Sequence, residues 1–433
     1  MSERHNHDSD YTAPTVDVDH GKLRRIALLA AVVGTIAFVA LGLVNLTAYG
    51  ATEGSHEHGQ EHGGIRDFFL TYQVGFIYWL SLPVGGMTLL LLSYLTSASW
   101  GLVLRRFFQA ATRTWPMMAV LFMPVAASLF MGEESSFWWA VEAKDIDFVK
   151  DNQVAIEEIA HKQHIYLNWP GFMVRATVVF LVFGLIMRGI RKWSPKAEDE
   201  GDEVYKNKLL MLGGPGVVAW ALLFTVGITD WVMSVEPTWA STMFPVVAGL
   251  NCLLTAFAFC TFLFYTIVGK NQTVLDIVKD KFRIDIGSLT LAFTMIWSYA
   301  SFCQFMLIWA GNIPEEIGYY KRRLNGGWEY MAYALMIVHW FLPFIILLFR
   351  EVKTDPQRMR KLTMMLLAIC AIDVIWWIVP SYPHVNGYLH VPMAIAAVVG
   401  IGGIWGLSFT KELAKSNILP KKDTAFLANW GHH

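Results

Sequence analysis

The chain has 433 residues, of which 55% are hydrophobic and only 16% are charged, and its formal net charge is −1. This composition is too apolar for an ordinary water-soluble protein of that length. The near-zero net charge indicates nothing about partners, and we expect no nucleic acid among them. Apolar runs of roughly 18 residues or more recur, each long enough to cross a hydrocarbon core of about 30 Å. The sequence therefore predicts a polytopic membrane protein.

The apolar runs predict an all-α protein with ten membrane-spanning helices. Trp and Tyr lie near many ends of these runs, where their partly polar rings prefer the interface between lipid and water. The ten expected spans are residues 26–48, 69–95, 115–131, 170–187, 212–233, 241–268, 289–311, 328–349, 362–382 and 391–409.

Positive residues outside the spans set the expected orientation. Most of them lie in the N-terminal tail, in the loops after spans 2, 4, 6 and 8, and in the C-terminal tail. Because Lys and Arg favour the cytoplasmic side, we expect both termini in the cytoplasm. Spans 2–5 and spans 6–9 then run in the same directions, which suggests two four-helix bundles in tandem.

We divide the chain into three parts on this basis. Residues 1–25 are expected to be a disordered cytoplasmic tail, residues 26–409 the ten-span membrane domain, and residues 410–433 a cytoplasmic C-terminal tail. Two loops on the outer side, 132–168 and 311–327, have helix-forming sequences and should form short caps, the second with Asn312 as its N-cap.

Cysteine and histidine usage gives no sign of a redox centre in this chain. Each of the four cysteines lies in an expected span, and their spacing matches no iron–sulfur or c-type haem motif: Cys252, Cys260, Cys303 and Cys370. A b-type haem in the membrane needs two axial ligands, but the spans contain one histidine, His339. We expect no haem, cluster or other metal here, and we interpret the histidine-containing loop 56–62 as solvated.

One carboxylate, Asp373, lies in a run that is otherwise apolar from Leu362 to Pro380. An ionisable side chain in the bilayer costs roughly 2.5–3.5 kcal/mol, so it needs a partner or a purpose. At 1.5 Å per residue, Asp373 and His339 both lie about 15–17 Å from the cytoplasmic ends of consecutive spans. The two side chains are therefore expected to meet at the middle of the membrane.

Three other polar residues have a similar depth: Asn251 on span 6, and Ser298 and Tyr299 on span 7. With His339 and Asp373 they would form a polar layer. Histidine exchanges protons near neutral pH, and a neighbouring carboxylate favours its charged form, so this layer could be a proton relay. A structural His–Asp pair that satisfies itself between helices is equally compatible with the pattern.

A second polar group is expected near the outer face, within spans 2 to 5. Arg175 lies about 10 Å below that face and can reach a carboxylate. Such a group would suit a quinone head, which needs a donor or acceptor at each carbonyl and a group that takes protons on oxidation. A structural salt-bridge network is the competing interpretation. The members of this outer polar group are Gln73, Glu133, Glu134, Arg175 and Asp230.

Three long segments resemble a known family. They are "HKQHIYLNWPGFMVRA" (161–176), "GITDWVMSVEPTWASTMF" (227–244) and "WSYASFCQFMLIWAGNIPEEIGYYKRR" (297–323). They are similar to the ActF membrane subunit of bacterial alternative complex III, which belongs to the NrfD/polysulfide-reductase membrane-subunit superfamily. The resemblance covers the chain from about span 2 to span 9.

The resemblance implies a multi-pass subunit of a quinol:electron-acceptor oxidoreductase in the bacterial cytoplasmic membrane, with cytochrome c or an oxidase as acceptor. It implies ten spans with two four-helix bundles. The implied partners, besides membrane lipids, are a paralogous NrfD-like membrane subunit, an iron–sulfur subunit of molybdoenzyme-like fold, c-type haem subunits and often a terminal oxidase. Two alternatives stay open: a secondary transporter or channel acting alone, and a structural scaffold for the redox subunits.

Overall fold

The computed structural model describes most of the chain, and every regular element in those residues is a helix, which confirms the expected all-α class. Loop 56–62 lies outside the described part. The described residues are 18–50, 64–96, 98–146, 149, 152–269, 280–382, 387–415 and 417–418.

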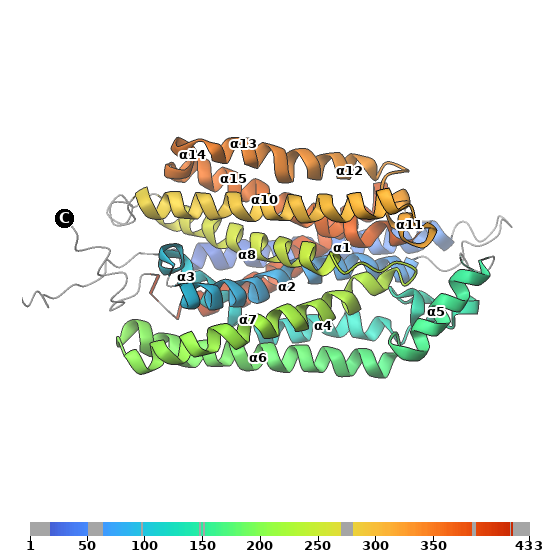
Figure 1. Ribbon diagram of the computed structural model, residues 1–433, viewed down its shortest axis with the longest axis horizontal. Coiled ribbons are helices and arrows are strands. Elements are labelled where there is room, and N and C mark those ends of the chain that lie inside the picture. Colours follow the sequence, from blue (N-terminus) through green and yellow to red (C-terminus); the bar gives the residue numbers. More distant parts are fainter. Residues whose placement is uncertain are drawn as a thin grey trace, which may run out of the picture.

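Long helices form the body of the protein, and Figure 1 shows them lying side by side. They are α1 (His20–Gly50), α2 (Gly64–Thr96), α6 (Trp169–Asp199), α7 (Glu203–Trp231), α8 (Phe244–Val268), α10 (Asp280–Gly311), α15 (Pro356–Ile378) and α16 (Gly387–Leu413). One further long segment is built from α12 (Glu329–Ala334), the π-helical turn η6 (Leu335–Phe341) and α13 (Leu342–Leu348).

Nine helical segments in the described part are long and apolar enough to cross a membrane, and each overlaps one of nine expected spans. Several are longer than expected: Trp169–Asp199 continues well past the end expected at residue 187, and Glu203–Val235 and Asp280–Gly311 begin well before residues 212 and 289. The third expected span, 115–131, corresponds to α4 (Trp115–Ser128), which has only 14 residues. The boundaries at residues 26 and 409 fall inside α1 and α16, so residues 20–25 are helical rather than part of a disordered tail.

The interior of the bundle is formed around α2 and α8. In Figure 1, α4, α6 and α7 lie on one side of this pair, and α10 with α12–α15 lies on the other. Helix α14 in this group is Arg350–Thr354. In the most apolar stretch of α2, 94% of residues are buried, against 22% in α7. The surface of α7 therefore faces lipid or a partner, whereas α2 is enclosed by protein.

Helix α3 (Ser99–Thr112) occupies a segment that the charge pattern placed in a cytoplasmic loop. Residues 101–112 are all buried, so this connection is a helix packed into the protein rather than a solvated loop. Two arginines of α3 are matched by the end of α6: Arg106 Nη2 lies 2.6 Å from Asp199 Oδ1, and Arg105 Nη1 lies 3.5 Å from Glu198 Oε1. Because these charges are paired within the protein, the segment does not need to stay in water.

Helices α1 and α16 pack against each other through small residues. A Cβ atom on Gly403 would overlap the backbone of Ala31, and one on Gly34 would overlap that of Gly400. Such close approach maximises backbone contact in the absence of a hydrophobic driving force within lipid. This pair holds the first helix of the described chain against the last.

The two ends of the bundle differ. At one end, here called the α11 end, residues 132–165 form the short elements η1 (Gly132–Glu134), η2 (Trp138–Ala140), η3 (Ala143–Asp145) and α5 (Gln153–Ile165), and residues 314–323 form α11 (Pro314–Arg323). The other end, which carries α3 and α14, is the α14 end (Figure 1). Short helices in the two expected cap regions are thus confirmed.

The start of α11 differs from the expectation. Ile313 occupies the N-cap position, with no side-chain capping bond, and Asn312 instead adopts a positive φ of 47°. Asparagine tolerates this left-handed conformation better than most residues. Asn312 therefore turns the chain out of α10 rather than capping the helix that follows.

Candidate functional site

Asp373 lies on α15 and is buried in the protein. Its Oδ2 atom accepts hydrogen bonds from Asn251 Nδ2 of α8 at 2.7 Å and from Trp297 Nε1 of α10 at 3.0 Å. Asp373 and Asn251 are each 1% exposed. Two donors on one carboxylate oxygen fix its orientation and offset part of the cost of burying it.

His339 reaches the same carboxylate from η6. Its Nδ1 atom lies 3.9 Å from Asp373 Oδ2, and its ring stacks on that of Trp297 at a centroid distance of 3.6 Å. On the other side, Nε2 lies 3.6 Å from Cys370 Sγ. The structure therefore brings His339, Asp373 and Asn251 together, as their common depth predicts. We call these residues, with Trp297, the central site.

The backbone at His339 is not an ordinary α-helix. Pro343 lies four residues further on and has no backbone N–H, so the α-helical bond to the His339 carbonyl cannot form. Residues 335–341 form a π-helical turn instead. Such turns place an extra residue in the helix and often occur at functional sites. His339 lies within this turn.

Ser298 and Tyr299 do not join this site, and their proposed place in it is corrected. Ser298 Oγ donates to the carbonyl of Met295 on its own helix, and Tyr299 is 69% exposed. Successive helical residues point about 100° apart, so residues of equal depth need not share a face. The neighbouring residue Trp297 supplies the contact from α10.

A short polar chain leads from the central site along α8. Thr255 Oγ1 donates to Asn251 Oδ1 at 3.1 Å, and Asn251 in turn donates to Asp373. Only His339 and Asp373 in this group exchange protons readily. At 3.9 Å their facing atoms lie beyond direct hydrogen bonding, but a small side-chain movement or one bridging water would join them.

The expected outer group contains one tight ion pair. Arg175 Nε of α6 lies 2.6 Å from Asp230 Oδ2 of α7. Arg175 also donates to the Tyr166 carbonyl at 3.1 Å, and its guanidinium lies 3.8 Å from the centre of the Tyr166 ring. Asp230 is buried, whereas 21% of the Arg175 side chain is exposed. A ligand could therefore approach the pair from the Arg175 side.

Of the other three members of the expected outer group, Gln73 lies beside this ion pair and the two glutamates lie elsewhere. Gln73 Nε2 donates to the carbonyl of Trp231, next to Asp230 in the chain. Glu134 accepts from the backbone N–H of Arg66, and the Glu133 carbonyl accepts from the Arg66 guanidinium. Arg175 is bonded to Asp230 and Tyr166 rather than to either glutamate. The five residues do not form one cluster.

Two buried polar clusters near the α11 end were missed. In one, Glu236 contacts Arg322 and Arg323. In the other, Asp67 Oδ2 lies 2.8 Å from His390 Nε2 and 3.2 Å from Asn45 Nδ2. In the sequence these residues lie at span ends or in loops. A charged residue there costs little on membrane insertion, so it does not stand out as a residue that needs a buried partner. The sequence feature that could have indicated these clusters is the position of their residues in or beside the polar connections expected on the outer side.

The fold and its buried polar residues define a multi-pass helical membrane protein. Comparison of the sequence with protein-family models and with curated proteins finds no match. Within the described residues, no three His, Cys, Asp or Glu side chains converge to hold a metal ion.

Proposed function

We propose that this chain is a membrane subunit of a quinol:electron-acceptor oxidoreductase of the alternative complex III type, in a bacterial cytoplasmic membrane. In this proposal it has ten spans, two tandem four-helix bundles and cytoplasmic termini. The resemblance of the three segments supports the family, and the distribution of Lys and Arg supports the orientation. The subunit does no redox chemistry by itself.

The proposal assigns proton transfer to the central site, and one observation carries this assignment. His339 and Asp373 are buried in mid-helix with their facing atoms 3.9 Å apart. In a relay, a proton on the Asp373 carboxyl passes to His339 Nδ1, which leaves a carboxylate held by Asn251 and Trp297. The imidazolium then releases a proton to the other side of the site. The two N–H donors stabilise the ionised carboxylate at that moment.

Quinol, of a type that we leave open, is assigned to the outer pair. Its hydroxyls need a hydrogen-bond partner and a group that accepts protons when electrons leave. Asp230 is the candidate acceptor, Arg175 orients the head group, and Gln73 supports the adjacent backbone at Trp231. Electrons would go to an iron–sulfur subunit and to c-type haem subunits, and a paralogous membrane subunit would complete the membrane part. Glu133 and Glu134 are not assigned to this site.

The experiment has two stages. The tagged protein is first purified from its membranes in mild detergent, where co-purifying c-type haem absorbance and iron–sulfur polypeptides are expected. The assembly is then placed in vesicles, and quinol-driven proton release is measured for wild type and for Asp373→Asn. With the assembly intact, the proton yield per quinol in Asp373→Asn should fall to the protons that quinol itself releases. Unchanged turnover and proton yield would contradict the relay.

A matched control removes a buried polar group elsewhere on the same bundle. Thr290 on α10 is buried, and its side-chain hydroxyl donates to the carbonyl of Ile286 on its own helix. Thr290→Val should leave proton release unchanged. If both variants lose the same activity, the effect of Asp373→Asn is structural.

One observation favours the transporter alternative. The spanning segment from Glu329 to Leu348 is interrupted by a π-helical turn beside a buried ionisable pair, and discontinuous helices of this kind often line solute sites. A transporter would purify as a colourless single species and would move a solute without a redox partner. The purification stage therefore separates the two functions.

A further inference from the structure

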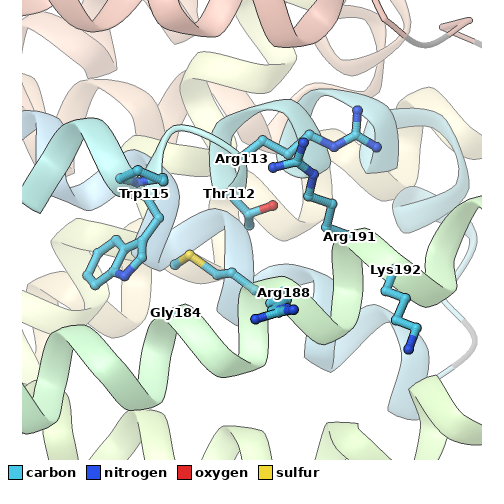
Figure 2. Close-up of a pocket in the computed structure, with 9 residues that line it drawn as sticks. Thr112, Arg113, Trp115, Gly184, Arg188, Arg191 and Lys192 are labelled. Carbon is cyan, nitrogen blue, oxygen red and sulfur yellow. The ribbon is translucent and has the colours of Figure 1, made fainter.

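A cavity of about 570 Å³ opens between α6 and the break that separates α3 from α4. Figure 2 shows its walls: Arg113 and Trp115 come from the break, and Gly184, Arg188, Arg191 and Lys192 come from α6. On α6, Gly184, Arg188 and Arg191 are spaced four and three residues apart, which places them on one helix face. The cavity therefore has a helix face as one wall and an interhelical turn as the other.

The cavity is strongly cationic. Its nine lining residues include Arg113, Arg188, Arg191 and Lys192, and none of the nine is acidic. In Figure 2 the side chains of Arg113 and Arg191 extend towards each other from opposite walls. Burial lowers the pKa of Arg113, Glu412 raises it, and the like charge of Arg191 lowers it further. An anion between the two guanidinium groups would relieve this repulsion.

The position of the cavity along α6 matches the level of lipid head groups. Leu181 and Leu185 on the same helix are 61% and 67% exposed, as expected of residues that face acyl chains. Within two further turns the exposed residues are Arg188, Arg191 and Lys192. A change from exposed leucine to exposed arginine over this distance marks the boundary between the hydrocarbon and polar regions.

Part of the cavity lining is apolar: Trp115, Pro116, Gly184 and Met187. Trp115 lines this part, with its ring 4.8 Å from that of Phe180 and its N–H bonded to the Phe180 carbonyl at 3.0 Å. Gly184 leaves room beside this ring, because a Cβ there would lie only 3.3 Å from Trp115 Nε1. The indole N–H is thus satisfied within the protein, and the ring presents an apolar surface to the cavity.

We propose that this cavity binds the phosphate of an anionic phospholipid. The phosphate lies among Arg113, Arg188 and Arg191, whose guanidinium groups match phosphate oxygens with paired N–H donors. Lys192 adds charge at the rim, and the acyl chains run along the exposed leucines of α6. Basic pockets between membrane helices bind anionic head groups in this way. The lipid joins α6 to the α3–α4 break, and this role does not depend on the proposed redox function.

The test measures retained and added lipid on the protein purified in mild detergent with any subunits that stay bound. Native mass spectrometry and thermal unfolding are carried out with phosphatidylglycerol, cardiolipin, phosphatidylcholine and inorganic phosphate. The wild type should retain and be stabilised by the two anionic lipids only. In Arg188→Gln/Arg191→Gln, the apparent affinity for phosphatidylglycerol should fall about tenfold or more.

The matched control is Arg24→Gln/Arg25→Gln, which removes two exposed positive charges from α1 at the same end of the bundle. It should keep wild-type lipid binding. If the charge variant does not fold, Gly184→Leu fills the apolar part without changing charge and should also weaken lipid retention. Equal lipid retention in the site variants and the control would overturn the proposal. So would stabilisation by inorganic phosphate equal to that by lipid, which would indicate a soluble phosphate ligand.

Discussion

Arg323 and Glu236 form a buried ion pair at the α11 end of the bundle, with Arg323 Nη1 3.1 Å from Glu236 Oε2. The same guanidinium donates to the carbonyls of Trp376 and Trp377, at 2.9 and 2.6 Å. These carbonyls belong to the last turn of α15 and have no donor within the helix. Arg323 therefore caps the helix that carries Asp373, and it joins α11 to the connection before α8.

Replacing Arg323 by methionine should destabilise the protein strongly. Arg323→Met leaves the Glu236 carboxylate with one fewer partner and leaves the last carbonyls of α15 without a hydrogen-bond donor. The expected cost is about 3–5 kcal/mol. Thermal unfolding in detergent measures the loss. Lys321→Met, an exposed position on the same helix, should change stability by less than about 0.5 kcal/mol. Similar shifts in both variants would contradict the capping role.

The raised pKa of the buried Tyr319 hydroxyl predicts that the protein loses stability at high pH. Burial raises its pKa to about 12; the Arg323 charge acts in the opposite direction. Between pH 10 and 12 the unfolded state has already lost this proton, so the folded state binds more protons and stability falls as pH rises. Tyr319→Phe removes the ionisable hydroxyl but keeps the ring on Trp239, whose centroid lies 3.8 Å away.

The variant should therefore lose less stability than wild type between pH 10 and 12, by roughly 2–3 kcal/mol at the upper limit. Unfolding midpoints measured at several alkaline pH values test this. Tyr330→Phe is the control, since Tyr330 is 72% exposed. A Tyr319→Phe curve that runs parallel to the wild-type curve would disprove the assignment.

Trp297→Phe should impair the central site without removing either proton-exchanging group. The variant loses the 3.0 Å bond to Asp373 but keeps an aromatic ring against His339. Loss of a hydrogen bond to a charged acceptor is worth about 1.5–3 kcal/mol, so proton release should slow by roughly tenfold or more. The pH profile should shift, while the KM for quinol stays constant. Trp309→Phe, at a half-exposed position on α10, serves as control.

Arg175→Lys tests the outer pair. Arginine bonds Asp230 and the Tyr166 carbonyl at once and stacks on the Tyr166 ring, and lysine cannot do all three. If quinol binds here, its KM should rise by about tenfold with a smaller change in kcat. Thr177→Val, an exposed position on α6, should leave both constants unchanged. An unchanged KM in Arg175→Lys would leave only the structural ion pair.

Gly403→Ala should separate α1 from α16. The added methyl overlaps the Ala31 backbone, which cannot move without shifting the helix, and overpacking of this kind costs about 1–3 kcal/mol. At Gly214 on α7, by contrast, a Cβ meets nothing within 4 Å, so Gly214→Ala should be neutral or stabilising by up to about 1 kcal/mol. Thermal unfolding of both variants measures the difference. Equal effects would show that the α1–α16 contact is not tight.

Depth along each helix could be predicted from the sequence alone. Apolar runs located nine full-length candidate spans, and counting residues along two of them placed Asp373 and His339 at one level. The same reasoning placed Arg175 within reach of a carboxylate, and the structure shows that this carboxylate is Asp230. These inferences succeed because a helix has a fixed rise per residue and because lipid excludes unpaired charge.

Rotation about each helix axis and burial of the connections were decided by tertiary structure. Trp297, and not Ser298 or Tyr299, faces Asp373, because the packing of α10 against its neighbours selects its inner face. Helix α3 is buried because α6 supplies carboxylates for its arginines, and Arg323 is buried because the end of α15 supplies carbonyls. A single sequence determines where a residue lies along its own helix, whereas its partners across the bundle depend on how all the helices pack together.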